Sequence, residues 1–340
     1  MASVKVTSQD VARRAGVSQP TVSRVFTPGV KVSSAMEAKV RRAAEELGYR
    51  PNTLARSLIT GQSMTIGLIV AYFDNPFYVE ALEKLSRALK DKGYNIMIFM
   101  AANHAGDVDQ VVQDLLDHQV DGIILASVST SSDLTARLNE EGVPLILFNR
   151  GHSDKSLSAV TSANRAGGAK VAEFLLAGGH ERMAHISGWQ GASTGRDRCD
   201  GFVSALQAKG KEPLAVVDGL FSREAAAAAT RSFFSAAETP DAIFVGNDHT
   251  AFAVLEVLRG ELGLDVGQDV SVIGYDDVAM SAWPSFDLTT VRQPANRMVD
   301  AVVAQLIAQI EGRATEPRQI EIDGPLIVRG SARKPEGWVE

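Results

Sequence analysis

A run of polar side chains between residues 18 and 24 could bind the edges of nucleic-acid bases. Arg24 can donate two hydrogen bonds to guanine, Gln19 can reach adenine, and Pro20 offers only an apolar contact. Nearby hydroxyl groups are better suited to capping helices or to contacting phosphates, which position a protein on DNA without specifying a sequence. These hydroxyls belong to Thr7, Ser18, Thr21 and Ser23.

Three short helices are predicted to position this run. Residues 7–10 have the form of a helix N-cap, and the first helix should end at Gly16. A second helix restarts at Ser18 with Pro20 in its first turn, and a third extends from about 34 to 47. This is a helix-turn-helix unit, so residues 1–49 are predicted as a DNA-binding domain with the second helix in the major groove. Taken singly, Ser18 can equally be a cap and Arg24 a surface charge.

The charge distribution supports a polyanionic partner for this unit. Residues 1–62 carry ten Lys and Arg against four Asp and Glu, whereas the remainder carries 24 basic and 37 acidic residues, within a net charge of -7. A basic N-terminal part on an acidic body is typical of a chain whose N-terminal part binds nucleic acid.

Residues 50–62 join the two parts. Pro51 is acceptable in the first turn of a helix, and Leu54, Ala55 and Leu58 would share one face. Helices shorter than about 12 residues are marginal in water, so residues 51–58 should be helical only when something packs on them. The segment is therefore predicted to be either a switch or a simple linker.

The remainder, residues 63–331, alternates apolar strands with amphipathic helices. Strands are predicted at 64–71, 95–100, 122–126, 144–148, 183–187, 215–218, 242–245 and 270–273. Helices are predicted near 76–92, 107–118, 132–141, 164–177, 197–209, 222–237, 248–260 and 294–311. Such alternation indicates parallel sheets covered by helices, and the number of strands indicates two doubly wound α/β lobes.

The ends of the predicted strands carry side chains that could bind a small molecule. Ligands of such sheets bind outside the carboxyl ends of strands, and with two lobes this means the cleft between them. Amide, acidic and guanidinium groups meet aromatic rings there, which suits a polyhydroxylated ligand. The candidates are Asn75, Phe77, Tyr78, Asn149, Thr194, Arg198, Phe221, Asn247 and Asp276. Several also have structural readings, with Asn247 as a helix N-cap and Phe77 as core.

The sequence offers no support for an enzyme, a metal site or a membrane protein. The six histidines have no metal-ligand spacing, and Cys199 has no activating partner nearby in the sequence. The Gly-rich stretch 188–195 lacks the Gly-Lys-Ser/Thr ending of a phosphate loop. No apolar run approaches the ~18 residues of a membrane-spanning helix, and a single cysteine suits a reducing compartment. We expect a cytoplasmic protein without a cofactor.

The chain resembles the LacI/GalR family of bacterial transcription regulators. The resemblance is carried by residues 6–18, 21–25, 46–52 and 54–58, and it continues to about residue 331. It implies that residues 51–58 form a hinge helix and that Leu58 is wedged into the minor groove at the operator centre. Within this segment, the residues expected to bind DNA are Asn52, Leu54, Ala55, Arg56 and Leu58.

The resemblance also implies a body like the periplasmic binding proteins, with the chain returning to the first lobe late in the sequence. The first lobe would comprise about 63–163 and 291–325, and the second about 164–290 and 326–331. Positions matching Asn149, Arg198, Asn247 and Asp276 contact sugar-type effectors, with Phe77 and Phe221 on the aromatic walls. Many sugar-binding members carry an acid where this chain has Asn149, so a purine or nucleoside effector remains an alternative.

The prediction is therefore a repressor whose affinity for operator DNA is controlled by a small ligand, most simply a sugar or sugar derivative. Whether the ligand acts as inducer or corepressor is open. A homodimer on a pseudopalindromic operator follows from the geometry of the reading helix. The tail, residues 332–340, has no apolar heptads and is not expected to form a tetramerising helix. The remaining alternative is a small-molecule binding protein that does not regulate through DNA.

Overall fold

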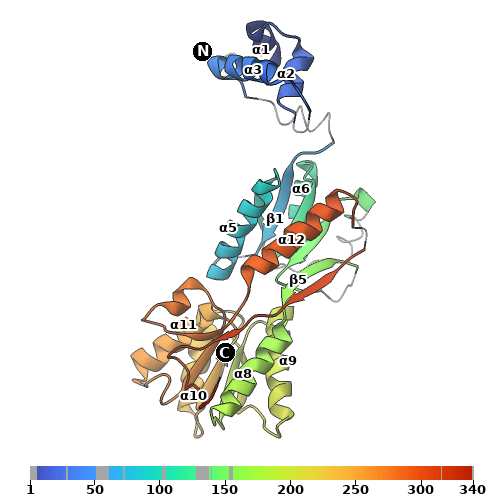
Figure 1. The fold of residues 1–340 in the computed structure, drawn as a ribbon. Coiled ribbons are helices and arrows are strands. Elements are labelled where there is room, and N and C mark those ends of the chain that lie inside the picture. The colour runs from blue at the N-terminus through green and yellow to red at the C-terminus, as the bar shows by residue number, and fades with distance from the viewer. Residues whose placement is uncertain are drawn as a thin grey trace. The chain divides into compact units, whose positions relative to one another are not determined.

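The computed structural model describes two compact units, one before Met64 and one from Met64 onward (Figure 1). The described residues are 6–27, 30–50, 61–71, 73–101, 105–127, 138, 140–152, 156–314 and 316–338. Residues 51–60, which include the predicted hinge helix, lie outside this set.

The N-terminal unit is a three-helix head. Its helices are α1 (Ser8–Ala15), α2 (Gln19–Val25) and α3 (Ser34–Leu47). Thr7 caps α1 through a capping box with Asp10, and Gly16 ends the helix in the left-handed conformation that glycine adopts most easily. Val11, Val22 and Val40 are fully buried between the three helices. The helix-turn-helix prediction is confirmed.

Ser18 differs in detail from its prediction. It occupies the N-cap position of α2, but its side chain makes no capping bond to the backbone. Its hydroxyl lies 2.9 Å from the hydroxyl of Thr21 instead. Ser18 therefore marks where α2 begins without satisfying a backbone N–H group of its first turn.

The first sheet of the body has the order β11-β5-β4-β3-β1-β2, with parallel pairing throughout. Its strands are β1 (Thr65–Val70), β2 (Asn95–Met100), β3 (Gly122–Ala126), β4 (Leu145–Phe148), β5 (Ser158–Ser162) and β11 (Gln319–Ile322). Helices α5 (Pro76–Asp91) and α12 (Ala295–Ile310) pack together over one face, and α6 (Ala105–Asp117) packs over the other (Figure 1).

The second sheet has the order β12-β10-β9-β8-β6-β7 and is parallel except for the short pairing of β10 with β12. Its strands are β6 (Met183–Ser187), β7 (Ala215–Asp218), β8 (Ala242–Val245), β9 (Ser271–Asp276), β10 (Thr289–Arg292) and β12 (Leu326–Ile327). Helices α8 (Asn164–Ala177) and α9 (Ser193–Gln207) lie on one face. Helices α10 (Arg223–Ser235) and α11 (Asp248–Glu256) lie on the other, and α11 continues into a π-helical turn, Val257–Glu261. A 3₁₀ helix spans Ala279–Ala282.

The chain passes between the two lobes three times. It crosses at Ala163, then between β10 and α12, and then between β11 and β12. Residues that follow parallel strands of both lobes line a common cleft. The predicted fold, with two lobes that are each doubly wound, is confirmed.

Two predicted boundaries near the cleft were wrong. Helix α9 begins at Ser193, four residues before the predicted 197, so Thr194 and Arg198 lie inside it. Strand β9 continues to Asp276, three residues beyond the predicted 273, so Tyr275 and Asp276 belong to the strand itself. Both corrections place these side chains on rigid elements.

The C-terminal segment packs on the second lobe. Ala332 is buried, and the Trp338 ring meets the Phe174 ring edge-on at 5.0 Å between centroids. No helix within the described part of the chain is long and apolar enough to cross a membrane.

Candidate functional site

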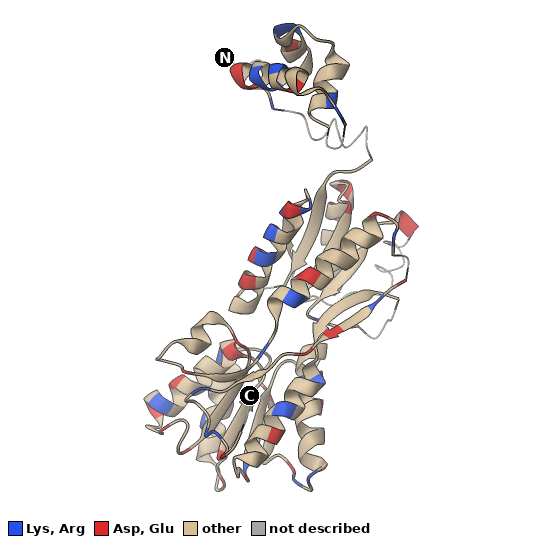
Figure 2. Ribbon diagram, viewed as in Figure 1, with Lys and Arg blue, Asp and Glu red and all other residues tan. Residues whose placement is uncertain are grey.

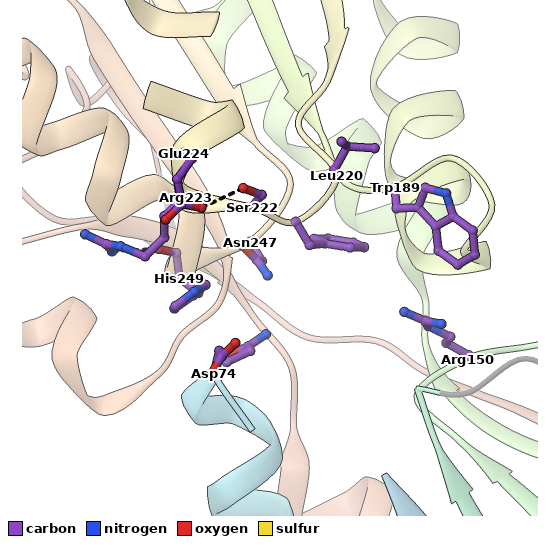
Figure 3. A pocket seen from close by; sticks show the side chains of 11 residues that line it. Asp74, Arg150, Trp189, Leu220, Ser222, Arg223, Glu224, Asn247 and His249 are labelled. Carbon is purple, nitrogen blue, oxygen red and sulfur yellow. Dashed lines mark hydrogen bonds between the residues drawn. The ribbon is translucent and has the colours of Figure 1, made fainter. Parts of the chain in front are cut away.

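A cleft of about 670 Å³ lies between the two lobes. Asp74, Asn75 and Arg150 line it from the first lobe. The second lobe contributes the loops after β6 and β7 and the beginning of α11 (Figure 3). The lining residues of the second lobe are Trp189, Leu220, Phe221, Ser222, Arg223, Glu224, Asn247 and His249. A volume of this size is typical of small-molecule sites, which span roughly 300 to 1,000 Å³.

Three of the nine predicted ligand-binding residues line this cleft, namely Asn75, Phe221 and Asn247. Asn75 caps α5 by accepting from the Phe77 backbone N–H, and Asn247 caps α11 by accepting from the Thr250 N–H. The structural reading of Asn247 as a helix N-cap is therefore correct, and Asn75 has the same role at α5. The other six predicted residues are buried and do not line it. They are Phe77, Tyr78, Asn149, Thr194, Arg198 and Asp276.

Asp276 lies directly behind the cleft and ties the two lobes together. Asn75 of the first lobe donates its side-chain N–H to one carboxylate oxygen at 2.8 Å. Gln293, on the second crossing, donates to the other at 2.6 Å. Burial raises the pKa of Asp276, against the lowering effect of the Arg198 guanidinium and of these hydrogen bonds.

Arg198 is held from three sides beneath the cleft. Its Nε donates to the Asn164 side chain at 2.9 Å, and one terminal nitrogen donates to the Gly246 carbonyl at 2.6 Å. The other terminal nitrogen lies 3.6 Å from Asp276, and the guanidinium stacks 3.6 Å above the centre of the Tyr275 ring. The prediction that Arg198 stands at the start of a helix was wrong, because α9 begins five residues earlier. Arg198 therefore contacts both Asn164, which follows the first crossing, and Asp276 at the end of β9.

A second polar cluster surrounds Asn149. This residue has a positive φ of 70° directly after β4, and its amide donates to the Tyr78 hydroxyl at 2.7 Å. Ser127 donates to the same hydroxyl. Among the described residues, the carbonyl oxygen of the Asn149 side chain is buried without a hydrogen-bond partner. An unsatisfied buried acceptor costs free energy, so this oxygen would gain from a ligand that donates an O–H or N–H.

Asp248 is a fully buried carboxylate at the first position of α11, next to Asn247. It accepts hydrogen bonds from Thr290 at 2.6 Å, from Ser281 at 2.7 Å and from the Val278 N–H at 3.0 Å. Burial, together with the charge of Asp276, raises the pKa of Asp248 to about 7. The carboxylate thereby connects the cleft wall to β10, just before the second crossing.

The predicted list of site residues did not include eight that line the cleft. These are Asp74, Arg150, Trp189, Leu220, Ser222, Arg223, Glu224 and His249. Asp74, Arg150 and Trp189 each follow a parallel strand, so the strand-end rule could have found them. His249 is the second residue of α11, and burial lowers its pKa. The remaining four belong to the turn after β7, which also carries the predicted Phe221, and to the start of α10.

The head presents the predicted DNA-reading residues on its surface. Ser18, which precedes α2, is exposed, as are Gln19, Pro20, Ser23 and Arg24 on the helix, while Val22 and Val25 face inward. Thr21 is partly buried, and the exposed Thr7 is engaged in the capping box of α1. Lys and Arg residues are distributed over all three helices (Figure 2). The predicted contacts at Asn52, Leu54, Ala55, Arg56 and Leu58 lie outside the described residues.

Comparison with known protein families accounts for both units. Residues 7–52 match the bacterial regulatory proteins of the lacI family. Residues 63–329 match the periplasmic binding proteins and sugar binding domain of the LacI family. The chain belongs to the LacI family. The predicted family resemblance is thus confirmed for the head and for the body.

Individual LacI-family regulators match almost the whole chain. The transcriptional regulator CelR of Thermobifida fusca is 34% identical over 96% of this chain and 98% of its own length. The ribose operon repressor of Escherichia coli K12 is 31% identical over 96% of this chain and 99% of its own.

Solved structures of the family agree with the fold. The Lac repressor dimer bound to operator and the anti-inducer ONPF matches with a TM-score of 0.87 at 26% identity, covering 97% of this chain and all of that chain. A complex of CelR with cellobiose matches with a TM-score of 0.73 at 32% identity, covering 96% of this chain and all of that chain.

Proposed function

We propose that this protein is a transcriptional repressor whose affinity for operator DNA is controlled by a small saccharide bound between the two lobes. The observation that carries the proposal is the combination of two parts in one chain. A helix-turn-helix head of the LacI family precedes a two-lobed body that matches the sugar binding domain of the same family. A regulator that acts on the bacterial chromosome works in the cytoplasm, and we propose no catalytic activity for it.

The side chains of the cleft support a neutral, hydroxyl-rich ligand. Asp74 and Glu224 line the cleft together with Arg150 and Arg223, and burial keeps His249 toward its uncharged form by lowering its pKa. Acids, guanidinium groups and amides in comparable number can accept from and donate to hydroxyl groups without selecting a net charge. The related repressor is named for the ribose operon, and the related CelR structure contains cellobiose.

The head supports binding to a two-fold symmetric operator. Exposed Gln19 and Arg24 at the start and end of α2 are the groups that would read base edges in the major groove. Hydroxyls at Ser18 and Ser23 would contact phosphates and fix the register. A homodimer would place two such helices on half-sites about one DNA turn apart.

The edge of the first sheet at β2 is a candidate surface for dimerisation. Strand β2 is the edge strand of the first sheet, and it exposes Ile98 and Met100 to 45% and 52%. Val79 on α5, which packs beside β2, is exposed to 52%. An edge strand with exposed apolar side chains is a ready template for pairing with a second copy. The related Lac repressor structure is a dimer.

We propose that residues 51–58 couple the two functions. Closing or opening the lobes around a ligand would move the first lobe, to which this segment leads, and would favour or melt a marginal helix. A coupling of about 1 to 3 kcal/mol gives a change of 5- to 150-fold in operator affinity.

The proposal is tested by combining calorimetry with a DNA-binding assay. The full chain is titrated with monosaccharides, disaccharides, sugar acids and nucleosides, and then with duplexes from the region upstream of its own gene. We expect one saccharide class to bind and one pseudopalindromic duplex to be retarded. The logarithm of the association constant for this duplex should fall linearly with the logarithm of the salt concentration. If a saccharide binds but no duplex is retarded, the protein is a small-molecule binding protein and not a regulator. If only nucleosides bind, the effector is a nucleoside and not a saccharide.

A further inference from the structure

The turn between β7 and α10 holds two bulky residues in a backbone conformation that they rarely adopt. Leu220 and Phe221 both have φ of 55°, and the Ser222 N–H closes the turn on the Gly219 carbonyl at 2.8 Å. Such turns favour Gly, which has no Cβ, and Asn and Asp, whose short polar side chains tolerate positive φ, whereas Leu and Phe rarely adopt it. Strain of this kind persists where the surroundings enforce it, and it is concentrated at functional sites.

Asp218 enforces this conformation and links the turn to a neighbouring loop. One of its carboxylate oxygens accepts from the Leu220 N–H at 2.9 Å, and the other accepts from the Gln190 N–H at 3.2 Å. Gln190 directly follows Trp189. A single carboxylate therefore positions the turn that carries Leu220 and the loop that carries Trp189.

The strained turn places apolar surface in the cleft instead of burying it. Leu220 lines the cleft and remains 57% exposed. Phe221 lies against Gly188, where an added Cβ would stand only 1.9 Å from the end of the phenyl ring. Trp189, the next residue, also lines the cleft and is partly exposed. The wall of the second lobe thus carries three apolar groups in succession.

The cleft has two chemically different ends (Figure 3). Asp74, Asn247 and His249 gather at one end with Ser222 and Glu224. Trp189 and Arg150 lie together at the other end, with Leu220 between the two groups. The Arg150 guanidinium, which comes from the first lobe, lies 5.7 Å from the centre of the Trp189 ring. This end is therefore bounded by an apolar wall on one lobe and a cation on the other.

We infer that Trp189 and Leu220 form a second subsite, and that the effector is a disaccharide or a glycoside with a second ring. The inference rests on the proposed function. One ring lies between Phe221 and the polar end, where Asn75 and Asn247 bind its hydroxyls. The second ring packs its apolar face on Leu220 and the edge of Trp189, and its hydroxyls accept hydrogen bonds from Arg150. The cleft volume of about 670 Å³ is more than a single pyranose ring fills.

Calorimetry on the full chain tests the second subsite. Glucose, ribose, cellobiose, maltose and lactose are titrated into the parent and into Trp189→Ala. At least one disaccharide should bind about 10- to 100-fold more tightly than either monosaccharide, and Trp189→Ala should remove that advantage while changing monosaccharide affinity less than about twofold. Trp283→Ala, which removes another exposed indole, is the matched control and should leave all affinities unchanged.

Leu220→Gly provides a readout that a purely structural role would not give. Glycine adopts positive φ without strain, so this variant should unfold at the same or a higher temperature than the parent. It should nevertheless bind the disaccharide more weakly, because the apolar side chain is gone. A structural residue would lose stability and affinity together.

The outcomes separate this inference from the function on which it rests. If monosaccharides bind as tightly as every disaccharide, or if Trp189→Ala weakens both classes equally, the second subsite is refuted and the saccharide-responsive regulator stands. If no saccharide binds the correctly folded parent, both are refuted.

Discussion

Asp276 is the residue at which the ligand cleft, the lobes and the crossings meet. Its carboxylate accepts from Asn75 and Gln293, and it lies beside Arg198 with its side chain only 1% exposed. The sequence placed Asp276 and Arg198 at strand ends, but it could not show that they are buried behind the cleft. That depends on where α9 begins and where β9 ends, which tertiary packing decides.

The Arg198→Ala variant should be strongly destabilised. Removing the guanidinium leaves Asp276 as a buried acid without its cation, and breaking such a pair typically costs about 3 to 5 kcal/mol. The midpoint of urea unfolding should fall accordingly, and the response of DNA binding to effector should be lost. Arg196→Ala, two residues earlier and 51% exposed, is the matched control and should change stability by less than about 0.5 kcal/mol. Equal midpoints for the two variants would contradict the assigned role.

Asp248 gives the body a specific dependence on pH. Its folded pKa of about 7 is above the ordinary value of 3.8, so the folded state holds a proton that the unfolded chain releases. Its contribution to stability is therefore lost as pH rises from about 4 to 7. His185, whose pKa burial lowers to about 4, acts in the opposite direction by losing stability as pH falls from 6.5 to 4.

Because these slopes oppose each other, the test compares Asp248→Asn with the parent. The stability of the variant relative to the parent should increase with pH between 4 and 7, by at most about 1.4 kcal/mol per pH unit. Chemical unfolding at several pH values measures the difference, and Asp300→Asn on the exposed side of α12 serves as the control. A difference that does not vary with pH would show that Asp248 titrates normally.

Elements with continuous apolar runs were predictable from sequence, and those made of small or polar residues were not. Strands β2, β3, β6, β7 and β8 were predicted with their observed bounds. Strand β5 was missed because Ser-Ala-Val-Thr-Ser has no apolar run, and the same holds for β10 and β11. Strand β12 is apolar but only two residues long, which is too short for a pattern to mark. The late start predicted for α9 has a similar cause. Gly195 reads as a loop residue, yet a Cβ there would stand 2.6 Å from the Trp189 carbonyl, so close packing requires glycine.

The segment 51–58 was predicted from composition and family resemblance, and it lies outside the described residues. If Leu58 is a minor-groove wedge, Leu58→Gly should weaken specific operator binding by at least about tenfold. Binding to non-specific duplex and to effector should remain as in the parent. Leu58→Met, which keeps an apolar side chain of similar size, is the matched control. Unchanged operator affinity in Leu58→Gly would remove the hinge role.

The protein as a whole combines a basic head with an acidic two-lobed body. The proposed dimer would place two heads on the two half-sites of a symmetric operator. A homodimer of this kind needs a contact surface between its two copies. The exposed apolar side chains of β2 are the candidate.

Replacing Ile98 and Met100 together with Asp should yield a monomer. Buried carboxylates would be unpaired in the dimer contact, which is costly. Light scattering after size exclusion measures the mass, and operator affinity should fall because one head then binds one half-site. Val216→Asp on β7, the exposed edge strand of the second sheet, is the matched control. A variant that remains dimeric would exclude this surface.

The central claim is that one ligand in the cleft changes how tightly the head binds DNA. Fluorescence anisotropy of a labelled operator duplex, titrated with the full chain in the presence and absence of saturating saccharide, measures this coupling directly. The Kd for operator should change by about 5- to 150-fold. An operator Kd that is the same with the cleft empty and with the saccharide demonstrably bound would contradict the account.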